Sequence, residues 1–329
     1  MKRRTLLPFS KIAVAAFALA TCLFTPLVPA QTAAWPANTI KIIVPSPPGV
    51  GSDLFARQYA EAMAKSMGVA VVVENRPGAA LTIAANLVAK STPDGYTVLF
   101  SPSNPLTISP FLLAKLPYNA QKDLLPVLQS ARGGSFILAG ASFAANDLKG
   151  LVALAKASPG KINFATYGPG STAHIGLELL QDAAGIEMLN VPYKTSALPD
   201  LIGGQVHVSF EPPASAIAQV RNGKVKALAY TGSKRNPAMP DVPTLAETYP
   251  GLEMPSWLGI WVAAGTPPAI IQRLHAEFAK ATHTAEVTKR LLDNGLEPAI
   301  TSPEETAALI QREAEAMGRI IKAKNIKIE

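Results

Sequence analysis

Short apolar runs rich in β-branched residues alternate along the chain with stretches whose apolar positions recur every three or four residues. The first run, "TIKIIVP", is followed by a loop and then by the helical pattern "DLFARQYAEAMAKSM", which ends at Gly68. Continuous apolar runs of this length indicate strands, and a 3.6-residue period indicates helices. The pattern predicts strands at 39–45, 69–75 and 95–101 and helices at 53–67 and 82–91. This alternation is typical of βα units around a largely parallel sheet.

A second series of the same kind begins near Phe136 and ends in a turn-rich segment before residue 250. Its strands are predicted at 135–140, 161–168, 187–194, 205–211 and 224–232, and its helices at 147–157, 172–184, 197–203 and 213–221. A strand at 256–265 and helices at 267–282, 284–293 and 303–322 follow. The two series, together with a C-terminal strand and helices that would rejoin the first series, predict an α/β protein of two lobes. Residues 31–135 and 250–329 would form lobe 1, and residues 136–249 would form lobe 2.

The first thirty residues have the composition of a secretory signal peptide. The start "MKRR" and Lys11 form a positive n-region, "IAVAAFALATCLF" forms an apolar h-region, and "VPA" at 28–30 is a small-residue cleavage site. We therefore predict residues 1–30 to be a signal peptide, with cleavage after Ala30 and export of the mature protein. Both the general secretory route and the twin-arginine route remain open, because the paired arginines are compatible with each.

Removal of this segment changes the charge of the protein. The full chain of 329 residues has 30 basic and 23 acidic residues, a net charge of +7, and four of the basic residues lie in residues 1–30. The mature chain keeps 26 basic residues against 23 acidic ones, a net charge of +3 that argues against a nucleic-acid partner. Cys22 is the only cysteine, and the histidines share no metal-site spacing. No later apolar run approaches the ~18 residues of a membrane helix, so we predict a soluble protein. We also expect a monomer without metal or cofactor.

Ligands of open α/β sheets bind beyond the carboxyl ends of the strands. The candidate binding loops are therefore those that follow predicted strands: 45–52, 75–81, 101–105, 167–172, 192–196 and 211–214. The first, in "IIVPSPPGVGSD", lacks the lysine of a P-loop and the third glycine of a dinucleotide fingerprint. It predicts either an anion site made by backbone N–H groups at a helix start or a glycine turn closed by Ser52 or Asp53 as a cap.

The loop "YGPGSTAHIG" presents the same two alternatives before the next helical pattern. Ser171 and Thr172 can cap the helix and offer hydroxyl groups, and His174 would lie in its first turn. A histidine at this place is either a ligand contact or a residue of the helix surface. The loop is not a nucleophile elbow, because Ser171 lies between Gly170 and Thr172 and not in a G-x-S-x-G motif.

Three further residues at strand ends are candidate ligand contacts. Tyr193, in "NVPYKTSA", has an apolar ring and a hydroxyl group that suit an organic acid. Lys194 supplies a positive charge or is a solvated loop lysine. Glu211 is either a cleft acid that accepts a ligand's proton donor or an ordinary strand-end residue. These residues form no convincing catalytic set, so capture of an anion is favoured over catalysis.

The motifs of these loops occur together in one known family. They include, in order, "KIIVPSPPGVGSDLFAR", "VVVENRPGAA", "TPDGYTVLF", "SPGKINFATYGPGSTAHIGLELL", "VPYKTSALPDLIGGQVHVSF" and "SWLGIWVAAGTPP". From about residue 35 to 329 the chain closely resembles the Bug family, the extracytoplasmic solute-binding receptors of tripartite tricarboxylate transporters. The resemblance implies a type II periplasmic binding protein, with two α/β lobes, a hinged ligand cleft and a small carboxylate as ligand. It also implies that these residues contact the ligand: Pro48, Gly49, Gly51, Asp53, Ser171, Thr172, His174, Tyr193 and Lys194.

Six residues at four places in the chain depart from the family pattern. Val50 stands where a run of glycines is common, Ala80-Leu81 where a glycine pair is common, and Thr195 where glycine is usual. Glu211-Pro212 stands where an aspartate-asparagine pair is frequent. Larger side chains at the glycine positions are expected to narrow or reshape the pocket, and the longer acid at 211 argues against a direct transfer of amino-acid or citrate recognition.

We therefore predict a non-enzymatic periplasmic receptor that closes on a small organic carboxylate and delivers it to the permease subunits of the membrane transporter. Dicarboxylates, tricarboxylates, aromatic acids and amino acids all remain open as ligands. A sensor that presents its ligand to a two-component system is the second hypothesis. An exported hydrolase is the third, and it is disfavoured because no serine, histidine and acid are recognisably arranged.

Overall fold

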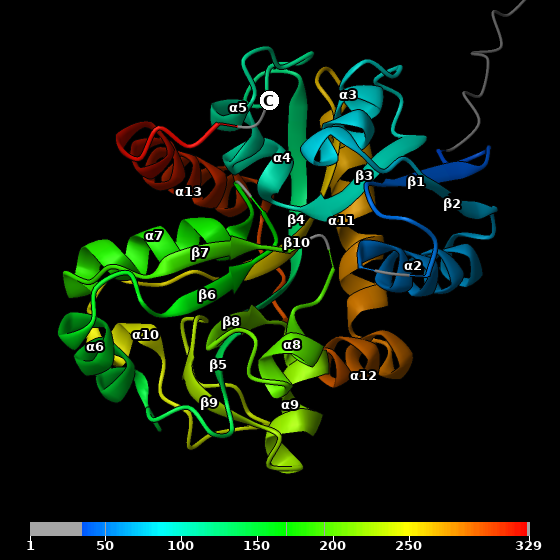
Figure 1. The fold of residues 1–329 in the computed structure, drawn as a ribbon. Coiled ribbons are helices and arrows are strands. Elements are labelled where there is room, and N and C mark those ends of the chain that lie inside the picture. Colours follow the sequence, from blue (N-terminus) through cyan, green and yellow to red (C-terminus); the bar gives the residue numbers. More distant parts are fainter. Residues whose placement is uncertain (1–34, 50, 169, 194, 328–329) are drawn as a thin grey trace, which may run out of the picture. The chain divides into compact units, whose positions relative to one another are not determined.

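The computed structural model describes residues 35–327 except residues 50, 169 and 194. Residues 38–329 form one compact unit, whose helices and strands are shown in Figure 1. The predicted signal peptide and its cleavage site, Val50 and Lys194 lie outside the described residues. Among the described helices, none is long and apolar enough to cross a membrane.

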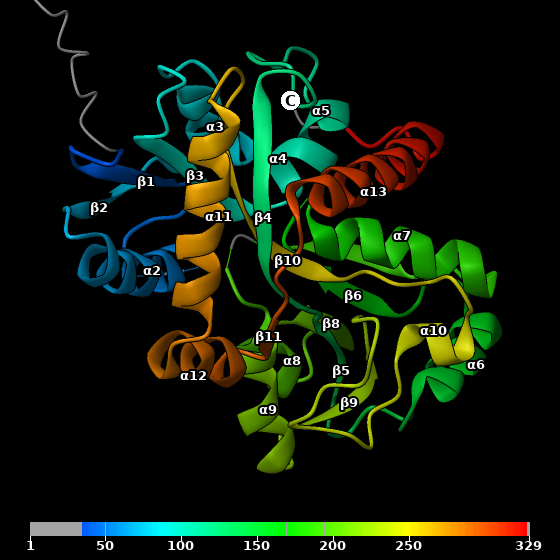
Figure 2. The ribbon, with the colours of Figure 1, turned by 180° about the vertical axis from the view of Figure 1, so that it is seen from behind.

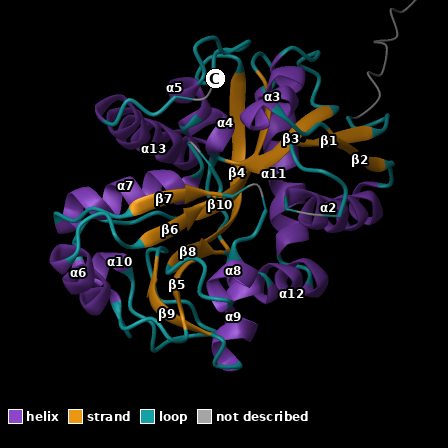
Figure 3. Cartoon of the chain, in the orientation of Figure 1, coloured by secondary structure: helices purple, strands orange, loops and turns teal. Residues whose placement is uncertain are grey.

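Two β-sheets form the core of this unit (Figure 3). The first has the strand order β11-β4-β10-β3-β1-β2, and the second has the order β7-β6-β8-β5-β9. The strands of the first sheet are β1 (Ile40–Val44), β2 (Val71–Asn75), β3 (Thr97–Pro102), β4 (Leu124–Gly133), β10 (Ser256–Ala263) and β11 (Leu296–Pro298). The strands of the second are β5 (Phe136–Gly140), β6 (Asn163–Thr166), β7 (Leu189–Pro192), β8 (Val208–Glu211) and β9 (Val225–Tyr230). The first sheet draws its strands from the segments predicted for lobe 1 and the second from 136–249, and the division into two lobes stays a proposal.

Both sheets are mixed, so the expectation of largely parallel sheets is wrong. β1 is parallel to β2 and β3, but β10 is antiparallel to β3 and β4, and β4 is antiparallel to β11. In the second sheet β6 is parallel to β7 and β8, whereas β5 is antiparallel to β8 and β9. The antiparallel pairs arise where the chain passes between the sheets, because β4 runs directly into β5 and β10 returns the chain to the first sheet. The sequence pattern missed β4, whose buried positions include the polar residues Gln129 and Ser130.

The predicted helices are present within two residues at each end. They are α2 (Ser52–Met67), α3 (Thr82–Ala89), α6 (Leu148–Ala157), α7 (Thr172–Ala184), α8 (Leu198–Ile202), α9 (Pro213–Arg221), α11 (Pro268–Thr282), α12 (Ala285–Asp293) and α13 (Pro303–Ala323). Four short helical segments were not predicted: the 3₁₀ turn η1 (Ala79–Leu81), α4 (Asn104–Thr107), α5 (Ser109–Leu112) and α10 (Leu245–Thr248). Gly68 ends α2 as predicted, with a left-handed φ of 70° and its N–H bonded to the Ala64 carbonyl at 3.0 Å.

Helices cover both faces of each sheet. On one face of the first sheet α2 and α11 pack together, where the Tyr59 ring lies 5.2 Å from Phe100 and 5.7 Å from Phe278. Figure 2 shows α11 lying beside β4 of this sheet. On the other face α3 and α13 pack against Trp257 and Trp261. In the second sheet α6 and α7 share one apolar cluster, and α8 and α9 share another. This layering leaves the loops at the strand ends to line any cleft between the sheets.

Packing between α7 and α13 joins elements of the two sheets. Ile175 of α7 and Ile321 of α13 belong to one buried apolar cluster, which also includes Leu112. At the end of α13 the Lys324 ammonium lies 2.6 Å from an Asp182 carboxylate oxygen of α7. Figures 1 and 2 both show the two helices side by side. These contacts hold α7 against the elements of the first sheet.

Candidate ligand-binding cleft

A cleft of ≈ 740 Å³ lies between elements of the two sheets, a volume typical of small-molecule sites. Elements of the first sheet supply Ala79, Ala80, Leu81, Asn104, Leu112 and Leu113 to its lining. Those of the second supply Tyr167, Gly170, Ser171, Thr172, Ala173, Phe210 and Pro212, and the crossovers supply Ser135, Thr231, Met254 and Ser256. Four of the six predicted loops therefore contribute, while no described residue of 45–52 or 192–196 belongs to this lining.

The start of α7 brings hydroxyl groups to the cleft. Ser171 is the N-cap, and its Oγ accepts a hydrogen bond from the His174 N–H at 3.2 Å. Thr172 Oγ1 accepts a bond from Asn104 Nδ2 at 3.3 Å, which links α7 to α4. Because each oxygen serves as an acceptor, each hydroxyl proton can be directed at a bound anion. The structure thus places Ser171 and Thr172 in the lining, and their contact with a ligand stays a prediction.

His174 supports the loop that precedes α7. Its Nδ1 accepts a hydrogen bond from the Gly170 N–H at 3.1 Å, and its Nε2 lies 3.8 Å from a Glu178 carboxylate oxygen. Burial lowers the pKa of His174, and the charge of Glu178 opposes this shift. The ring is therefore neutral at neutral pH with its proton on Nε2. His174 positions Gly170 and is not part of the described lining.

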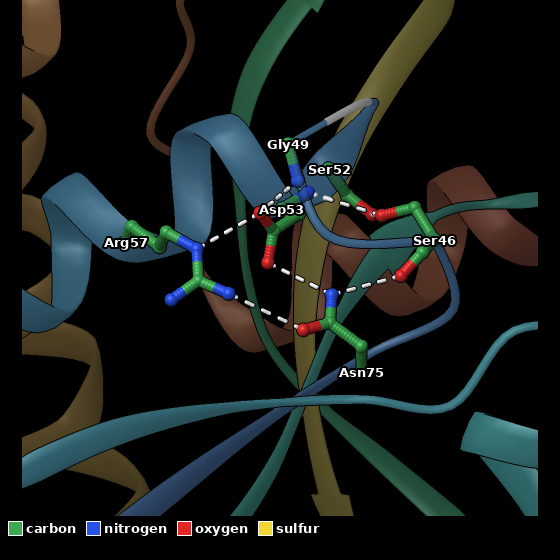
Figure 4. Close-up of polar contacts among 6 residues, drawn as sticks. All are labelled: Ser46, Gly49, Ser52, Asp53, Arg57 and Asn75. Atoms are coloured by element: carbon green, nitrogen blue, oxygen red, sulfur yellow. Dashed lines mark hydrogen bonds and ion pairs between the residues drawn. The ribbon is translucent and has the colours of Figure 1, made fainter.

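Asp53 lies at the centre of a network that closes the first loop (Figure 4). Its Oδ2 accepts hydrogen bonds from the Gly49 N–H at 2.7 Å and from Arg57 Nε at 2.9 Å. Its Oδ1 accepts from Asn75 Nδ2 at 2.8 Å, and its own N–H donates to Ser46 Oγ at 3.0 Å. Burial raises the pKa of Asp53, but the bonds from its three donors outweigh burial and hold the pKa below its usual value.

The first loop is therefore a turn clamped by a buried carboxylate. The Gly49 N–H, which the anion hypothesis would direct at a ligand, points at Asp53 instead. Gly49 and Gly51 have φ angles of 80° and 56°, which glycine adopts without strain. Pro48, Gly49, Gly51 and Asp53 are not among the described lining residues. Of the two alternatives left open by the sequence, this geometry favours the closed turn, and ligand contact by this loop stays a prediction.

Tyr193 follows β7 and is directed toward α8. Its hydroxyl donates a hydrogen bond to Asp200 Oδ2 at 2.7 Å, and its ring packs against the apolar cluster under α8 and α9. It is not among the described lining residues. Its predicted role as a ligand contact, like that of Lys194, is not tested by this geometry.

Glu211 is buried at the end of β8 and is surrounded by hydroxyl groups. Its Oε2 accepts hydrogen bonds from the Tyr167 hydroxyl at 3.2 Å and from Ser196 and Ser215 at 3.3 Å each. Burial raises the pKa of Glu211, and the bonds from these hydroxyls oppose that shift. Because Tyr167 lines the cleft and Glu211 does not, the acid positions Tyr167 in this structure. A direct ligand contact by Glu211 stays a prediction.

Thr231 joins the two chain crossovers beside the cleft. Its N–H donates to the Ser135 carbonyl at 2.9 Å, and its Oγ1 accepts from the Ser135 N–H at 2.8 Å. The same Oγ1 donates to the Met254 carbonyl at 3.1 Å. The backbones approach so closely here that a Cβ added to Gly134 would lie 2.4 Å from the Gly232 nitrogen. We call the contacts of Thr231 with Ser135 and Met254 the clasp. A hinge between the sheets would act here, because the chain crosses between the sheets at these residues.

Some of the lining residues missed by the sequence analysis lie in the indicated loops, and others lie outside them. Asn104 and Tyr167 lie in loops that the strand-end rule had already indicated, so a wider choice within those loops would have included them. Leu112, Leu113 and Met254 belong to segments without a recognisable local pattern. Only the tertiary structure brings this second group to the cleft.

A search against protein families finds one match over most of the chain. The sequence model of the tripartite tricarboxylate transporter family receptor, TctC, matches residues 55–326. The chain belongs to this receptor family. The receptor is also similar to BugT of Bordetella pertussis, with 34% identity over 305 residues that cover 92% of this chain and 94% of BugT. The resemblance to the Bug family is thereby confirmed.

Two solved structures from Rhodopseudomonas palustris are similar to the receptor along most of its length. Rpa4515 with adipate has a TM-score of 0.77 and 29% identity, and covers 89% of this chain and 100% of its own. MatC with bound malate has a TM-score of 0.73 and 31% identity, and the match covers 87% of this chain and 100% of the MatC chain. These similarities confirm the expected α/β fold of a periplasmic binding protein.

Proposed function

We propose that the chain is a periplasmic solute-binding receptor that captures a small organic carboxylate and delivers it to the permease subunits of a tripartite tricarboxylate transporter. It acts by binding and not by catalysis. The observation that carries this proposal is the start of α7, a helix of 13 residues, which lies in the lining of the ≈ 740 Å³ cleft with the hydroxyl groups of Ser171 and Thr172.

A helix start of this kind favours a negative group. The first N–H groups of a helix have no partner within it, and the aligned peptide dipoles place partial positive charge there. The two hydroxyl protons add donors at the same place, since both oxygens already accept hydrogen bonds. A carboxylate that binds at this point would be met by donors without needing a cationic side chain.

The similar structures and the family support the remaining parts of the proposal. Adipate and malate, bound by Rpa4515 and MatC, are both small carboxylates. The family description supports a transporter as the partner, and the predicted signal peptide supports a periplasmic location. The clasp at Thr231 supports closure by a hinge, which requires the ligand to bind the closed form more tightly than the open form.

Alanine replacement at the start of α7 tests the proposal. Thermal-shift screening of the mature chain against carboxylic acids identifies a ligand, because binding to the folded state raises the melting temperature. The double variant Ser171→Ala/Thr172→Ala should then bind that acid at least ~10-fold more weakly in calorimetry, since each hydrogen bond to a charged group contributes about 1.5–3 kcal/mol.

A second helix cap provides the control. Thr284 caps α12 by accepting a bond from the Val287 N–H at 3.4 Å, and it is not among the described lining residues. Thr284→Ala should lower stability by about 1 kcal/mol while leaving affinity unchanged. Unchanged affinity of the α7 variant would remove that helix start from the site. A protein that no carboxylate stabilises would refute the proposed function.

A further inference from the structure

The turn after β2 has a backbone conformation that is unusual for its residues. Ala79, Ala80 and Leu81 have φ angles of 46°, 50° and 70°. This is the left-handed region, which residues other than glycine, asparagine and aspartate rarely enter. Three such residues in succession persist only when the surrounding structure holds them in place. All three line the cleft.

Neighbouring side chains hold this turn by its carbonyl groups. The buried Ser109 of α5 donates a hydrogen bond to the Ala80 carbonyl at 2.8 Å. The buried Thr82 donates to the Ala79 carbonyl at 2.6 Å. Protein donors therefore occupy these two carbonyl oxygens, and the Leu81 N–H donates to the Gly78 carbonyl at 3.0 Å. The side chains of the turn are two methyl groups and the isobutyl group of Leu81, so they are entirely apolar.

The side chains described along this ≈ 740 Å³ cleft are electrically neutral, whereas an adjoining cavity, which shares Asn104, Thr172 and Met254 with it, is also lined by Glu253, Arg312 and Glu313. Leu112, Leu113, Phe210 and Met254 add apolar surface, and no described lining residue is a lysine, arginine, histidine, aspartate or glutamate. One carboxylate can be met by the donors at the start of α7. A second carboxylate would lie away from this helix start, with only single side-chain donors such as Ser135 and Ser256 and no cationic partner among these residues to replace its water, which is unfavourable. An apolar ligand body would instead gain from burial.

We propose that the Ala79–Leu81 turn is the specificity-determining wall of the cleft and that it selects monocarboxylates with an apolar body over di- and tricarboxylates. This inference rests on the proposed function and narrows its ligand. A wall of three side chains leaves less room for a second hydrated carboxylate than a glycine turn would. The ligands of Rpa4515 and MatC, adipate and malate, are dicarboxylates. The proposal therefore separates this receptor from those two in specificity.

Hexanoate and adipate form a matched pair for the test, because they have the same number of carbons and differ in one carboxylate. We expect calorimetry on the mature chain to show hexanoate binding at least ~10-fold more tightly than adipate, because a second buried charge without a partner is costly. Leu81→Ala should weaken hexanoate binding about 5- to 10-fold by removing apolar contact.

Ile83→Ala is the control variant, since Ile83 lies two residues further on, is 45% exposed and is not a described lining residue. It should leave hexanoate affinity unchanged. Adipate binding as tight as hexanoate, or a Leu81→Ala variant with unchanged hexanoate affinity, would overturn the proposal. Tight adipate binding that Lys194→Ala abolishes would also overturn it, by showing a cation at the site. If Leu81→Ala does not fold, the ligand pair still decides the question on the natural chain. Failure of every carboxylate to bind would refute the proposed function itself, and with it this specificity.

Discussion

Replacement of Ala80 by glycine should make the receptor more stable. Ala80 has a φ of 50° and a ψ of 41°, and lies between two other left-handed residues. The left-handed conformation costs a residue with a Cβ about 1–2 kcal/mol, and glycine adopts it without this cost. Glycine in turn costs about 0.5–1 kcal/mol in the entropy of the unfolded chain. The difference predicts a gain of about 0.5–1 kcal/mol in the free energy of unfolding.

The same substitution at a helical position should have the opposite effect. Ala153 is exposed in the interior of α6, where the backbone is right-handed. Ala153→Gly should therefore lower the free energy of unfolding by about 1 kcal/mol. Both variants remove one methyl group and create no charge, so the sign of the change reports the backbone conformation at each position.

Urea denaturation of the mature chain, followed by circular dichroism, measures both changes as shifts of the midpoint. Ala80→Gly should also raise the melting temperature by about 1–4 °C, given the size of the domain. If Ala80→Gly destabilises the protein as much as Ala153→Gly does, position 80 is not left-handed in solution. The account of the 79–81 turn as a strained wall would then be refuted.

Two further predictions concern buried carboxylates. Asp53→Asn removes the ion pair with Arg57 and should lower the free energy of unfolding by about 1–2 kcal/mol at pH 7. Because its folded-state pKa is lowered, Asp53 contributes stability above the unfolded pKa that is lost as the pH falls through the folded pKa. The difference in urea midpoint between natural protein and variant should therefore shrink below about pH 4, and a constant difference would contradict this. Glu211 has the opposite sign, because burial raises its pKa and the folded state keeps the proton longer. The melting temperature of the natural protein minus that of Glu211→Gln should therefore increase as the pH is lowered from 7 toward 5. A decrease of this difference would show that the folded structure stabilises the charged carboxylate.

Much of the local structure could be predicted from the sequence alone. Strands such as β1 and helices such as α7 were predicted because their apolar periodicity and their ends are encoded within a few residues. β4 was not, because Gln129 and Ser130 are buried there and interrupt any regular pattern. The Gln129 N–H is bonded to hydroxyl groups of Thr301 and Thr306, more than 170 residues away in the chain. Such partners cannot be read from a local window.

The candidate site, too, could be predicted from the sequence only in part. The strand-end rule located the loops that contain Asn104, Tyr167 and Ser171, since a parallel pairing places successive loops at one edge whatever their side chains are. It did not tell which way a side chain in those loops would turn. For Asp53 the sequence left a cap and a ligand contact open; in this structure its carboxylate bonds to Asn75, which is brought near by the pairing of β1 with β2, and ligand contact stays a prediction.

The sequence by itself determined the alternation of strands and helices, the loops at their ends and the family. These depend on local periodicity, on the conformational preferences of glycine and proline, and on motifs contiguous in the chain. Only the tertiary structure decided that the first loop is clamped shut, that Glu211 supports Tyr167, and that a left-handed turn of alanines and a leucine forms one wall of the cleft. Each of these depends on which distant donors reach a given oxygen, as Ser109 reaches the carbonyl of Ala80. Such contacts exist only once the sheets have assembled.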